Sequence, residues 1–269
     1  MKSNHLRNKI SRREFVQRSG ITASGLLLLA DLSALRSNKY SIKAVIFDGF
    51  PIFDPRPIFE KVNELFPEKG KRLNEIWKSN QFSYQWLRVS ANKYKNFWDL
   101  TQDALDFAAT VCDINLTMAD KNTIMNQYHM IDVWPDVIPS LNILKSNNLR
   151  LCILSNMTAR MLNQGIQNSN TSEYFDYVIS TDQKKTFKPG PAAYQMGMDT
   201  LQLKKEEILF VAFAGWDMAG AKWFGYPTYW VNRLNSPIDR LDAEPDGIGK
   251  NLNDLVEFVK TYDAKQKNI

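Results

Sequence analysis

The second half of the chain alternates short apolar runs with amphipathic segments, and this alternation limits the possible folds more than any other feature. Runs rich in β-branched and aromatic residues predict strands at 149–154, 176–180, 208–213 and 228–231. Segments with helical periodicity follow them at 159–167, 191–200, 218–224 and 252–262. Strands that alternate with helices build right-handed crossovers and a parallel sheet. The sequence therefore predicts an α/β fold with a Rossmann-like parallel sheet.

A further apolar run at 45–47 predicts the first strand, and it ends at Asp48. Gly49 and Pro51 follow, so the chain must turn there. A carboxylate at the carboxyl end of a buried parallel strand lies where open α/β sheets bind ligands. It is also placed to act as a nucleophile. Taken alone, Asp48 could equally cap the turn that follows.

Residues 56–130 lack this alternation and show helical periodicity with many aromatic side chains, which indicates a helical insert. A helix begins after Trp134 and Pro135 and runs to about residue 146. We therefore expect a core of residues 41–55 and 131–262, a helical cap of residues 56–130 and a tail of residues 263–269.

Residues 1–40 differ in charge from the rest of the chain. They hold eight Lys or Arg and two Asp or Glu, whereas the remainder holds 26 basic and 27 acidic residues. Arg12 and Arg13, with Phe15 and a short apolar run after them, resemble a twin-arginine signal. We expect this leader to direct export to the periplasm through the twin-arginine machinery, with an uncertain cleavage site. A basic amphipathic arm is the alternative.

The nearly neutral body gives no indication of nucleic-acid binding.

Histidine and cysteine counts exclude several classes of site. The two histidines are His5 and His129, too few for a histidine-rich zinc site and, with one in the leader, a poor basis for a Ser-His-Asp triad. Cys112 and Cys152 are too few for a disulfide scaffold or a thiolate metal site. Cys152 lies in an apolar run and is expected to be a buried small residue.

Polar residues recur at the predicted strand ends or in the loops after them, in the order acid, hydroxyl with amide, lysine, acid. They are Asp48, Ser155 with Asn156, Lys188 and Asp217. This order resembles the haloacid dehalogenase-like superfamily, and several segments are similar to the type II 2-haloacid dehalogenases. The segments are Ile-Leu-Ser-Asn at 153–156, Phe-Lys-Pro at 187–189, Ile-Leu-Phe-Val at 208–211 with Gly-Trp-Asp at 215–217, and the insert segments 76–78 and 84–88. The resemblance covers residues 42–260.

The resemblance implies a hydrolase that displaces halide from a short 2-haloalkanoic acid without a metal or another cofactor. Asp48 would be the nucleophile and would form an aspartyl ester that water then cleaves. Lys188 would balance the charge of Asp48 and position it. Asp217 would orient Lys188 and the hydrolytic water. The family often forms homodimers, so a homodimer is also expected.

The resemblance also implies which residues bind the substrate. Ser155 would hold the substrate carboxylate, Asn156 would line the polar floor, and Tyr194 matches a site tyrosine of the family. Lys78 aligns with the arginine that cradles the halide. An apolar wall would be built by Phe82, Phe97 and Trp216. Two simpler roles are also open, because Ser155 could be a helix N-cap and Lys188 a solvated loop charge.

Several residues depart from the family pattern and leave two alternatives open. Polar family residues are replaced at Ile52, Ala212 and Ala214, the usual tyrosine is Phe50, and Pro51 and Lys78 also differ. A phosphatase of the same superfamily would need an acid in place of Phe50 and a magnesium ion. A degenerate, non-catalytic exported domain is the other alternative. The retained Asp48 and Lys188 favour an active enzyme that is slow or altered in its substrate.

Overall fold

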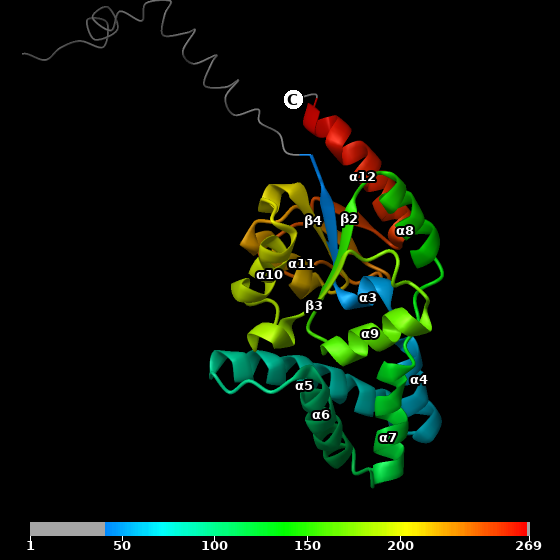
Figure 1. The fold of residues 1–269 in the computed structure, drawn as a ribbon. Helices are drawn as coiled ribbons and strands as arrows, with labels where there is room; N and C mark the ends of the chain where they lie inside the picture. The colour runs from blue at the N-terminus through cyan, green and yellow to red at the C-terminus, as the bar shows by residue number, and fades with distance from the viewer. Residues whose placement is uncertain (1–40, 268–269) are drawn as a thin grey trace, which may run out of the picture.

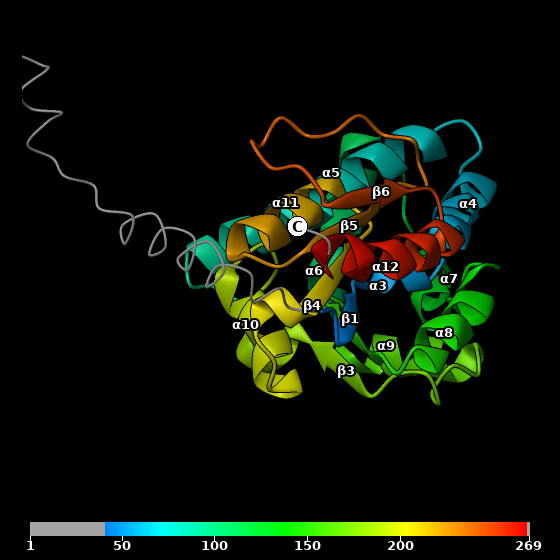
Figure 2. The same cartoon turned by 90° about the horizontal axis from the view of Figure 1, so that it is seen from above.

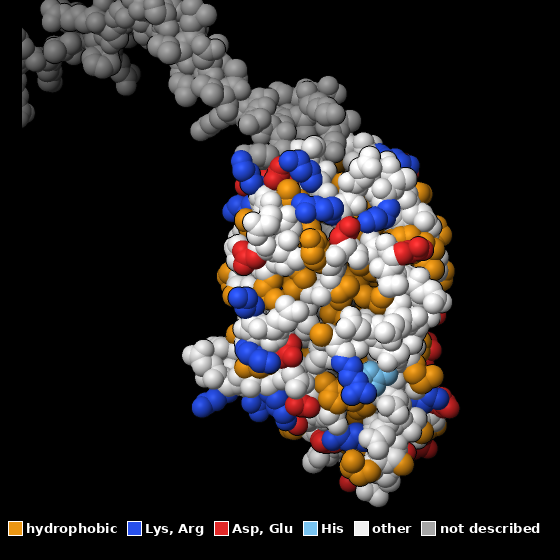
Figure 3. Space-filling view, viewed as in Figure 1, with side chains coloured by type: hydrophobic (Ala, Val, Ile, Leu, Met, Phe, Trp, Pro, Cys, Tyr) orange, Lys and Arg blue, Asp and Glu red, His pale blue; other side chains and the backbone are white. Residues whose placement is uncertain are grey.

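The computed structural model describes residues 41–267, so the predicted leader of residues 1–40 lies outside the described residues. The described chain folds into an α/β core with a helical insert below one edge of its sheet (Figure 1). Lys, Arg, Asp and Glu side chains are interspersed on the face shown in Figure 3, as expected for a nearly neutral body. No helix among the described residues is both long enough and apolar enough to cross a membrane.

The core is built on a six-stranded sheet in the order β3-β2-β1-β4-β5-β6, and every neighbouring pair is parallel. The strands are β1 Ala44–Phe47, β2 Arg150–Ser155, β3 Tyr177–Ser180, β4 Ile208–Ala212, β5 Thr228–Val231 and β6 Gly247–Gly249. Central β1 pairs with β2 on one side and with β4 on the other, and all four of its residues are buried. This confirms the predicted α/β fold with a parallel sheet.

Helices cover both faces of the sheet (Figures 1 and 2). On one side lie α8 Val137–Ser146, α9 Ala159–Asn168 and α12 Leu252–Lys267, and on the other lie α10 Pro191–Leu201 and α11 Gly215–Phe224. Successive strand residues point to opposite faces. Val45 and Phe47 therefore belong to the apolar core under α8, α9 and α12, whereas Ala44 and Ile46 belong to the core under α10 and α11.

The insert is helical throughout its regular parts, as predicted. It consists of α4 Arg56–Leu65, α5 Gly70–Ser90, α6 Phe97–Val111, α7 Met118–Asn126 and the short 3-10 helix η1 Gln127–His129. Trp77 joins α5 to α6, because its indole N–H donates to the carbonyl oxygen of Thr101 at 2.8 Å. The insert lies beyond the carboxyl ends of the strands, where α5 faces the core (Figure 1).

The boundaries differ from the prediction in three places. Helix α11 begins at Gly215, three residues earlier than expected, so Asp217 lies in its first turn rather than in a loop. Helix α12 runs to Lys267 and includes most of the predicted tail of residues 263–269. Strand β6 was not predicted, because a three-residue Gly-Ile-Gly segment carries almost no periodic signal.

Candidate active site

Asp48 follows β1 directly and begins the short helix α3 Gly49–Ile52. Its Oδ2 accepts a hydrogen bond from the backbone N–H of Phe50 at 3.2 Å. The carboxylate is therefore a helix cap, as in the simpler interpretation, and is also a lining group of a cavity. Its side chain is 12% exposed, which is enough to reach a ligand in that cavity.

Lys188 lies between two carboxylates. Its Nζ is 2.7 Å from Asp48 Oδ1 and 2.5 Å from Asp217 Oδ2, and the lysine side chain is fully buried. Burial lowers the pKa of the Lys188 ammonium, but the charges of Asp217 and Asp48 outweigh this and raise the pKa above its usual value. The lysine therefore stays protonated and is not the solvated loop charge of the alternative interpretation.

Asp217 is buried at the start of α11, and its environment shifts its ionisation. Burial raises the pKa of Asp217 to about 6, with Lys188 opposing and Asp48 adding to the shift. Tyr194 donates its hydroxyl to Asp217 Oδ1 at 2.7 Å and to the Asp217 carbonyl oxygen at 3.1 Å. Such a donor favours the ionised carboxylate.

Tyr194 corrects one expectation. It was predicted to bind substrate, but its side chain is fully buried beneath the sheet and is not part of the cavity lining. Its ring packs against Phe210 with centroids 5.4 Å apart, in the core under α10 and α11. Gly220 lets the Tyr194 hydroxyl approach α11 closely, because a Cβ at this position would lie 2.5 Å from the hydroxyl oxygen. Tyr194 is a positioning residue behind Asp217.

Asn156 lines the cavity as expected, but its amide is already engaged. Its Oδ1 accepts from the Lys188 N–H at 2.9 Å and from Thr181 Oγ1 at 3.3 Å. Its Nδ2 donates to Gln85 Oε1 at 2.9 Å and to the Lys188 carbonyl oxygen at 3.3 Å. Asn156 therefore holds the backbone of Lys188 in place and connects it to α5 of the insert.

Ser155 also lines the cavity, at the end of β2. Its Oγ accepts from the backbone N–H of Met157 at 3.2 Å. The N-cap of α9 is Thr158, so the alternative role of Ser155 as that cap is wrong. Ser155 lies close to the nucleophile turn because Gly49 lacks a side chain, and a Cβ on Gly49 would be 2.9 Å from both Ser155 Oγ and Met157 Cε.

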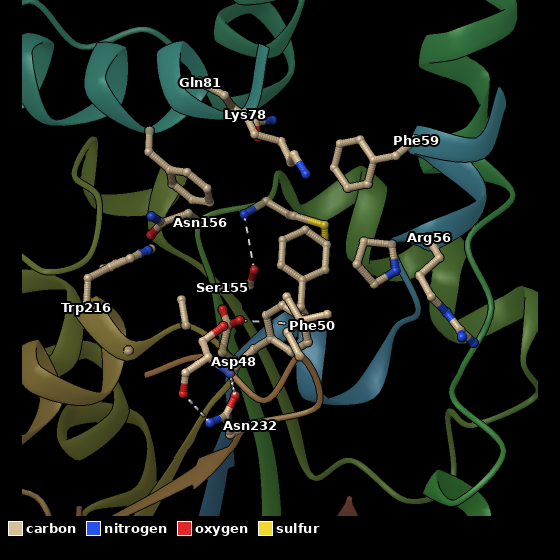
Figure 4. A pocket seen from close by; sticks show the side chains of 18 of the residues that line it. Asp48, Phe50, Arg56, Phe59, Lys78, Gln81, Ser155, Asn156, Trp216 and Asn232 are labelled. Carbon is tan, nitrogen blue, oxygen red and sulfur yellow. Dashed lines mark hydrogen bonds between the residues drawn. The ribbon is translucent and has the colours of Figure 1, made fainter. Parts of the chain in front are cut away.

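A cavity of about 560 Å³ separates these strand ends from the insert (Figure 4). Lys78 and Trp216 line it, as predicted, and so do the expected wall residues Phe82 and Phe97. The Trp216 ring packs against Phe82 of α5 with centroids 5.5 Å apart. The Lys78 ammonium lies 4.7 Å from the centre of the Phe59 ring. The aromatic wall therefore comes from both the core and the insert.

The structure adds lining residues that the sequence did not single out, namely Arg56, Phe59, Gln81, Tyr128, Trp134 and Asn232. One of them carried a usable signal. Gln81 follows Lys78 by three residues and precedes Gln85 by four, so these polar residues share one face of a helix. Tyr128 and Asn232 belong to segments far apart in sequence, and no local pattern points to them.

The residues that depart from the family pattern lie in two settings. Ile52 and Ala212 are fully buried, so each fills apolar space. Ala214 lines the cavity and is also the N-cap of α11, where its side chain offers no hydrogen bond to the first turn. Among residues 41–267, no group of three or more His, Cys, Asp or Glu side chains is arranged to hold a metal ion.

Three comparisons agree on the family of this site. The sequence profile described as haloacid dehalogenase-like hydrolase matches residues 29–225. The (S)-2-haloacid dehalogenase of Pseudomonas sp. strain YL is 31% identical over 225 residues, 83% of this chain and 97% of that protein. A crystal structure of an L-2-haloacid dehalogenase aligns with a TM-score of 0.80 at 36% identity over 82% of this chain and 99% of that one. The enzyme from Xanthobacter autotrophicus, solved with chloropropionic acid covalently bound, aligns at 0.75 with 28% identity over 81% and 98%.

Proposed function

The chain belongs to the haloacid dehalogenase-like hydrolases and, within them, to the 2-haloacid dehalogenases, and we propose on this premise that it hydrolyses 2-haloalkanoic acids through an ester on Asp48. The observation that carries the proposal is the placement of Asp48 between a fully buried, protonated Lys188 and a ligand-sized cavity. A carboxylate held in this way is fixed in orientation, and its second oxygen is directed by a single backbone N–H.

The reaction proceeds in two steps. In the first, Asp48 Oδ2 attacks the carbon that bears the halogen, the carbon–halogen bond breaks, and the halide leaves with the bonding pair. Oδ1 remains paired with Lys188 during this step. In the second, water adds to the carbonyl carbon of the ester and the bond from this carbon to the substrate oxygen breaks. One proton of the water leaves with the 2-hydroxy acid, and the other passes to solvent as the Asp48 carboxylate is regenerated. Because water attacks the enzyme carbon, one Asp48 oxygen comes from solvent in each turnover.

The remaining site residues hold the substrate. Ser155 Oγ lines the cavity beside Asp48 and would donate its hydroxyl to the substrate carboxylate. Lys78 supplies a positive charge on the insert side, where the departing halide accumulates charge, although an ammonium lacks the planar fork of the family arginine. Trp216 and Phe82 exclude water from the reacting atoms, which strengthens the charge interactions.

Halide release from (S)-2-chloropropionate, with and without EDTA, tests the proposal. We expect release that EDTA leaves intact, and intact-protein mass spectrometry should show an acyloxy adduct that is absent from Asp48→Asn. Single-turnover reaction in oxygen-18 water should label the Asp48 carboxylate. A strict magnesium requirement with phosphate esters as substrates would instead identify a phosphatase. An intact fold with neither activity would identify a non-catalytic domain.

We also propose that residues 1–40 direct export to the periplasm through the twin-arginine machinery. Support comes from Arg12 and Arg13 ahead of a short apolar run. Replacing both arginines with lysine should leave the protein in the cytoplasm with its body folded, as measured by fractionation and circular dichroism. Unchanged export of that double variant would contradict the proposal.

A homodimer of the body is a further proposal. Leu87 of α5 and Phe107 of α6 are 66% and 45% exposed, which leaves apolar surface available on the insert. Light scattering after size-exclusion chromatography should give twice the mass of one chain. The mass of a single chain at micromolar concentration would contradict it.

A further inference from the structure

The cavity extends well beyond the groups that would hold a short acid. Its lining includes Arg56, Phe59, Glu60 and Asn63 of α4, which are spaced as one face of a helix. Seven helical rises of about 1.5 Å separate Arg56 from Asn63, so this face is about 10 Å long. Asp48 and Ser155 lie at the strand ends on the other side of the same cavity (Figure 4). The cavity therefore has an outer half along α4.

A three-carbon acid does not fill this space. Its end atoms are roughly 4 Å apart, as judged from carbon–carbon bonds of about 1.5 Å. Cavities of about 300–1,000 Å³ are typical sites for ligands of drug size, and this one has about 560 Å³. A chloropropionate held by Asp48 and Ser155, with its halogen toward Lys78, would leave the α4 face beyond Lys78 occupied by water.

The outer half has a defined lining, which we call the outer compartment and define as Phe50, Pro55, Phe59 and Lys78. Phe50 comes from α3 and Phe59 from α4, and Lys78 reaches in from α5 (Figure 4). Edge-to-face contacts orient both phenyl rings. Phe59 packs against Trp77 with centroids 5.8 Å apart, and Phe50 against Phe213 at 6.0 Å. The compartment is therefore mainly apolar and aromatic, with the Lys78 ammonium at its edge and Arg56, Glu60 and Asn63 of α4 beside it.

This combination of groups distinguishes an aromatic occupant from an alkyl one. An alkyl chain beside the Lys78 ammonium would displace its water and return no compensating interaction. The face of an aryl ring attracts a cation, as the ring of Phe59 already does at 4.7 Å. An aryl ring also gains edge-to-face contacts with neighbouring phenyl groups, which an alkyl chain cannot make.

We propose that the outer compartment is a subsite for an aryl group, so that the preferred substrate is a 2-halo acid with an aromatic substituent, of the 2-halo-3-arylpropionic class. The proposal rests on the proposed function, because Asp48 and Ser155 would hold the reacting end. The aryl group would extend from C3 toward α4, with its ring against Phe59 and the Lys78 ammonium between the ring and the departing halide.

The test compares kcat/KM for halide release from three (S)-2-bromo acids: 2-bromopropionate, 2-bromohexanoate and 2-bromo-3-phenylpropionate. All three have the same leaving group, and the hexanoate provides apolar bulk without a ring. We expect the phenyl compound to exceed the hexanoate about three- to tenfold, as expected for one added aromatic contact. A phenyl compound that is equal to or poorer than the hexanoate would overturn the proposal.

Two variants localise the effect. Phe59→Leu keeps an apolar side chain but removes the ring, and it should bring the phenyl-to-hexanoate ratio close to one. Phe107→Leu is the matched control, because Phe107 lies on α6, is 45% exposed and does not line the cavity, so the ratio should not change. A ratio that Phe59→Leu leaves unchanged would contradict the assignment of this subsite.

The proposed function and the subsite can fail separately. If none of the three acids releases bromide, the dehalogenase function has failed. Titration calorimetry with 3-phenyllactate and lactate, which correspond to the products, then examines the subsite alone. Tighter binding of 3-phenyllactate that Phe59→Leu abolishes would support the aryl subsite, and equal binding of the two would overturn it.

Discussion

The two sides of the cavity are built in different ways. The core side, which we call the floor, consists of the lining residues Asp48, Ser155, Asn156 and Ala214, with Lys188 and Asp217 directly behind them. Their polar atoms have protein partners, with distances of 2.5 and 2.7 Å around the Lys188 ammonium. The insert side, which we call the cap face, is the surface of α5 that carries Lys78 and Phe82. Its contacts are mostly between rings, and Lys78 is exposed.

This difference follows from the cost of burying charge. Buried charges require partners, so each floor residue depends on the others and a change at one disturbs all of them. Ring contacts are individually small and tolerate substitution more readily. We therefore expect the chemistry to reside in the floor and the cap face to be the part of the site that varies with substrate.

The largest expected effect comes from removing the charge at the centre of the floor. Lys188→Met leaves the carboxylates of Asp48 and Asp217 buried without their cation. Breaking a buried pair typically costs about 3–5 kcal/mol, which as lost transition-state stabilisation is roughly a 10²–10⁴-fold lower rate. Single-turnover halide release measures the rate, and urea unfolding measures the stability of the same variant.

The same substitution on the cap face gives the matched comparison. Lys78→Met removes an exposed ammonium, so the free energy of unfolding should stay within about 0.5 kcal/mol of the wild type. Its kcat/KM should fall about tenfold or less. The contrast between floor and cap face would be wrong if Lys78→Met were as destabilising as Lys188→Met.

The activity of the enzyme should depend on the ionisation of Asp217. Its pKa is raised to about 6 by burial, so below pH 6 the carboxyl gains a proton and loses the charge that pairs with Lys188. We expect kcat/KM to be level above pH 7 and to fall about tenfold per pH unit well below pH 6. Asp217→Asn should be slow but lack this limb between pH 5 and 7. A wild-type profile that stays flat to pH 5 would show that Asp217 is not needed in its ionised form.

Most of the floor was predictable because parallel strands collect their carboxyl ends at one edge. Asp48 and Ser155 end adjacent strands, so their order in the chain was enough to bring them together. Tyr194 shows the limit of this reasoning. Its spacing of six residues from Lys188 placed it near the site, but spacing does not say whether a side chain of α10 reaches the cavity. The structure directs Tyr194 toward Asp217 from behind.

Contacts between distant segments could not be predicted. Trp134 donates its indole N–H to the carbonyl oxygens of Phe50 and Phe53, 3.0 and 3.1 Å away. Arg233 donates to the carbonyl oxygen of Pro51 at 3.0 Å and stacks over the Trp134 ring. These contacts hold the turn that follows Asp48. They join residues 81–182 positions apart in the chain, and no local periodicity reports such pairs.

Tyr194 supports the floor from behind through its hydrogen bond to Asp217. Tyr194→Phe removes the hydroxyl that favours ionised Asp217. A hydrogen bond to a charged group is worth about 1.5–3 kcal/mol, and one pKa unit corresponds to about 1.4 kcal/mol. The acid limb, which is the fall of kcat/KM at low pH, should therefore move up by roughly one to two pH units. Measured at pH 7, kcat/KM should fall about two- to tenfold, because the ionised fraction of Asp217 falls from nearly all to about a half or a tenth.

Tyr226→Phe is the matched control for this variant. Tyr226 is equally buried in the same apolar core, but its hydroxyl donates to the backbone carbonyl oxygen of Tyr194 at 2.8 Å and not to a carboxylate. Its loss should lower stability by about 1 kcal/mol without moving the limb. If both variants shift the limb equally, Tyr194 acts through packing and not through its hydrogen bond to Asp217.

The smallest expected effect lies at Ala214, where the floor lacks a polar side chain. Ala214 is the N-cap of α11 in an extended conformation, and its methyl group cannot accept from the N–H groups of the first turn. Ala214→Asn should therefore raise the free energy of unfolding by about 0.5–2 kcal/mol. If its amide also orients water at the ester, hydrolysis of the intermediate should speed up by as much as about tenfold. Ala214→Ser separates the two effects, because serine also caps the helix but is too short to reach the ester. Equal acceleration in both variants would show that capping of α11, and not contact with water, limits turnover.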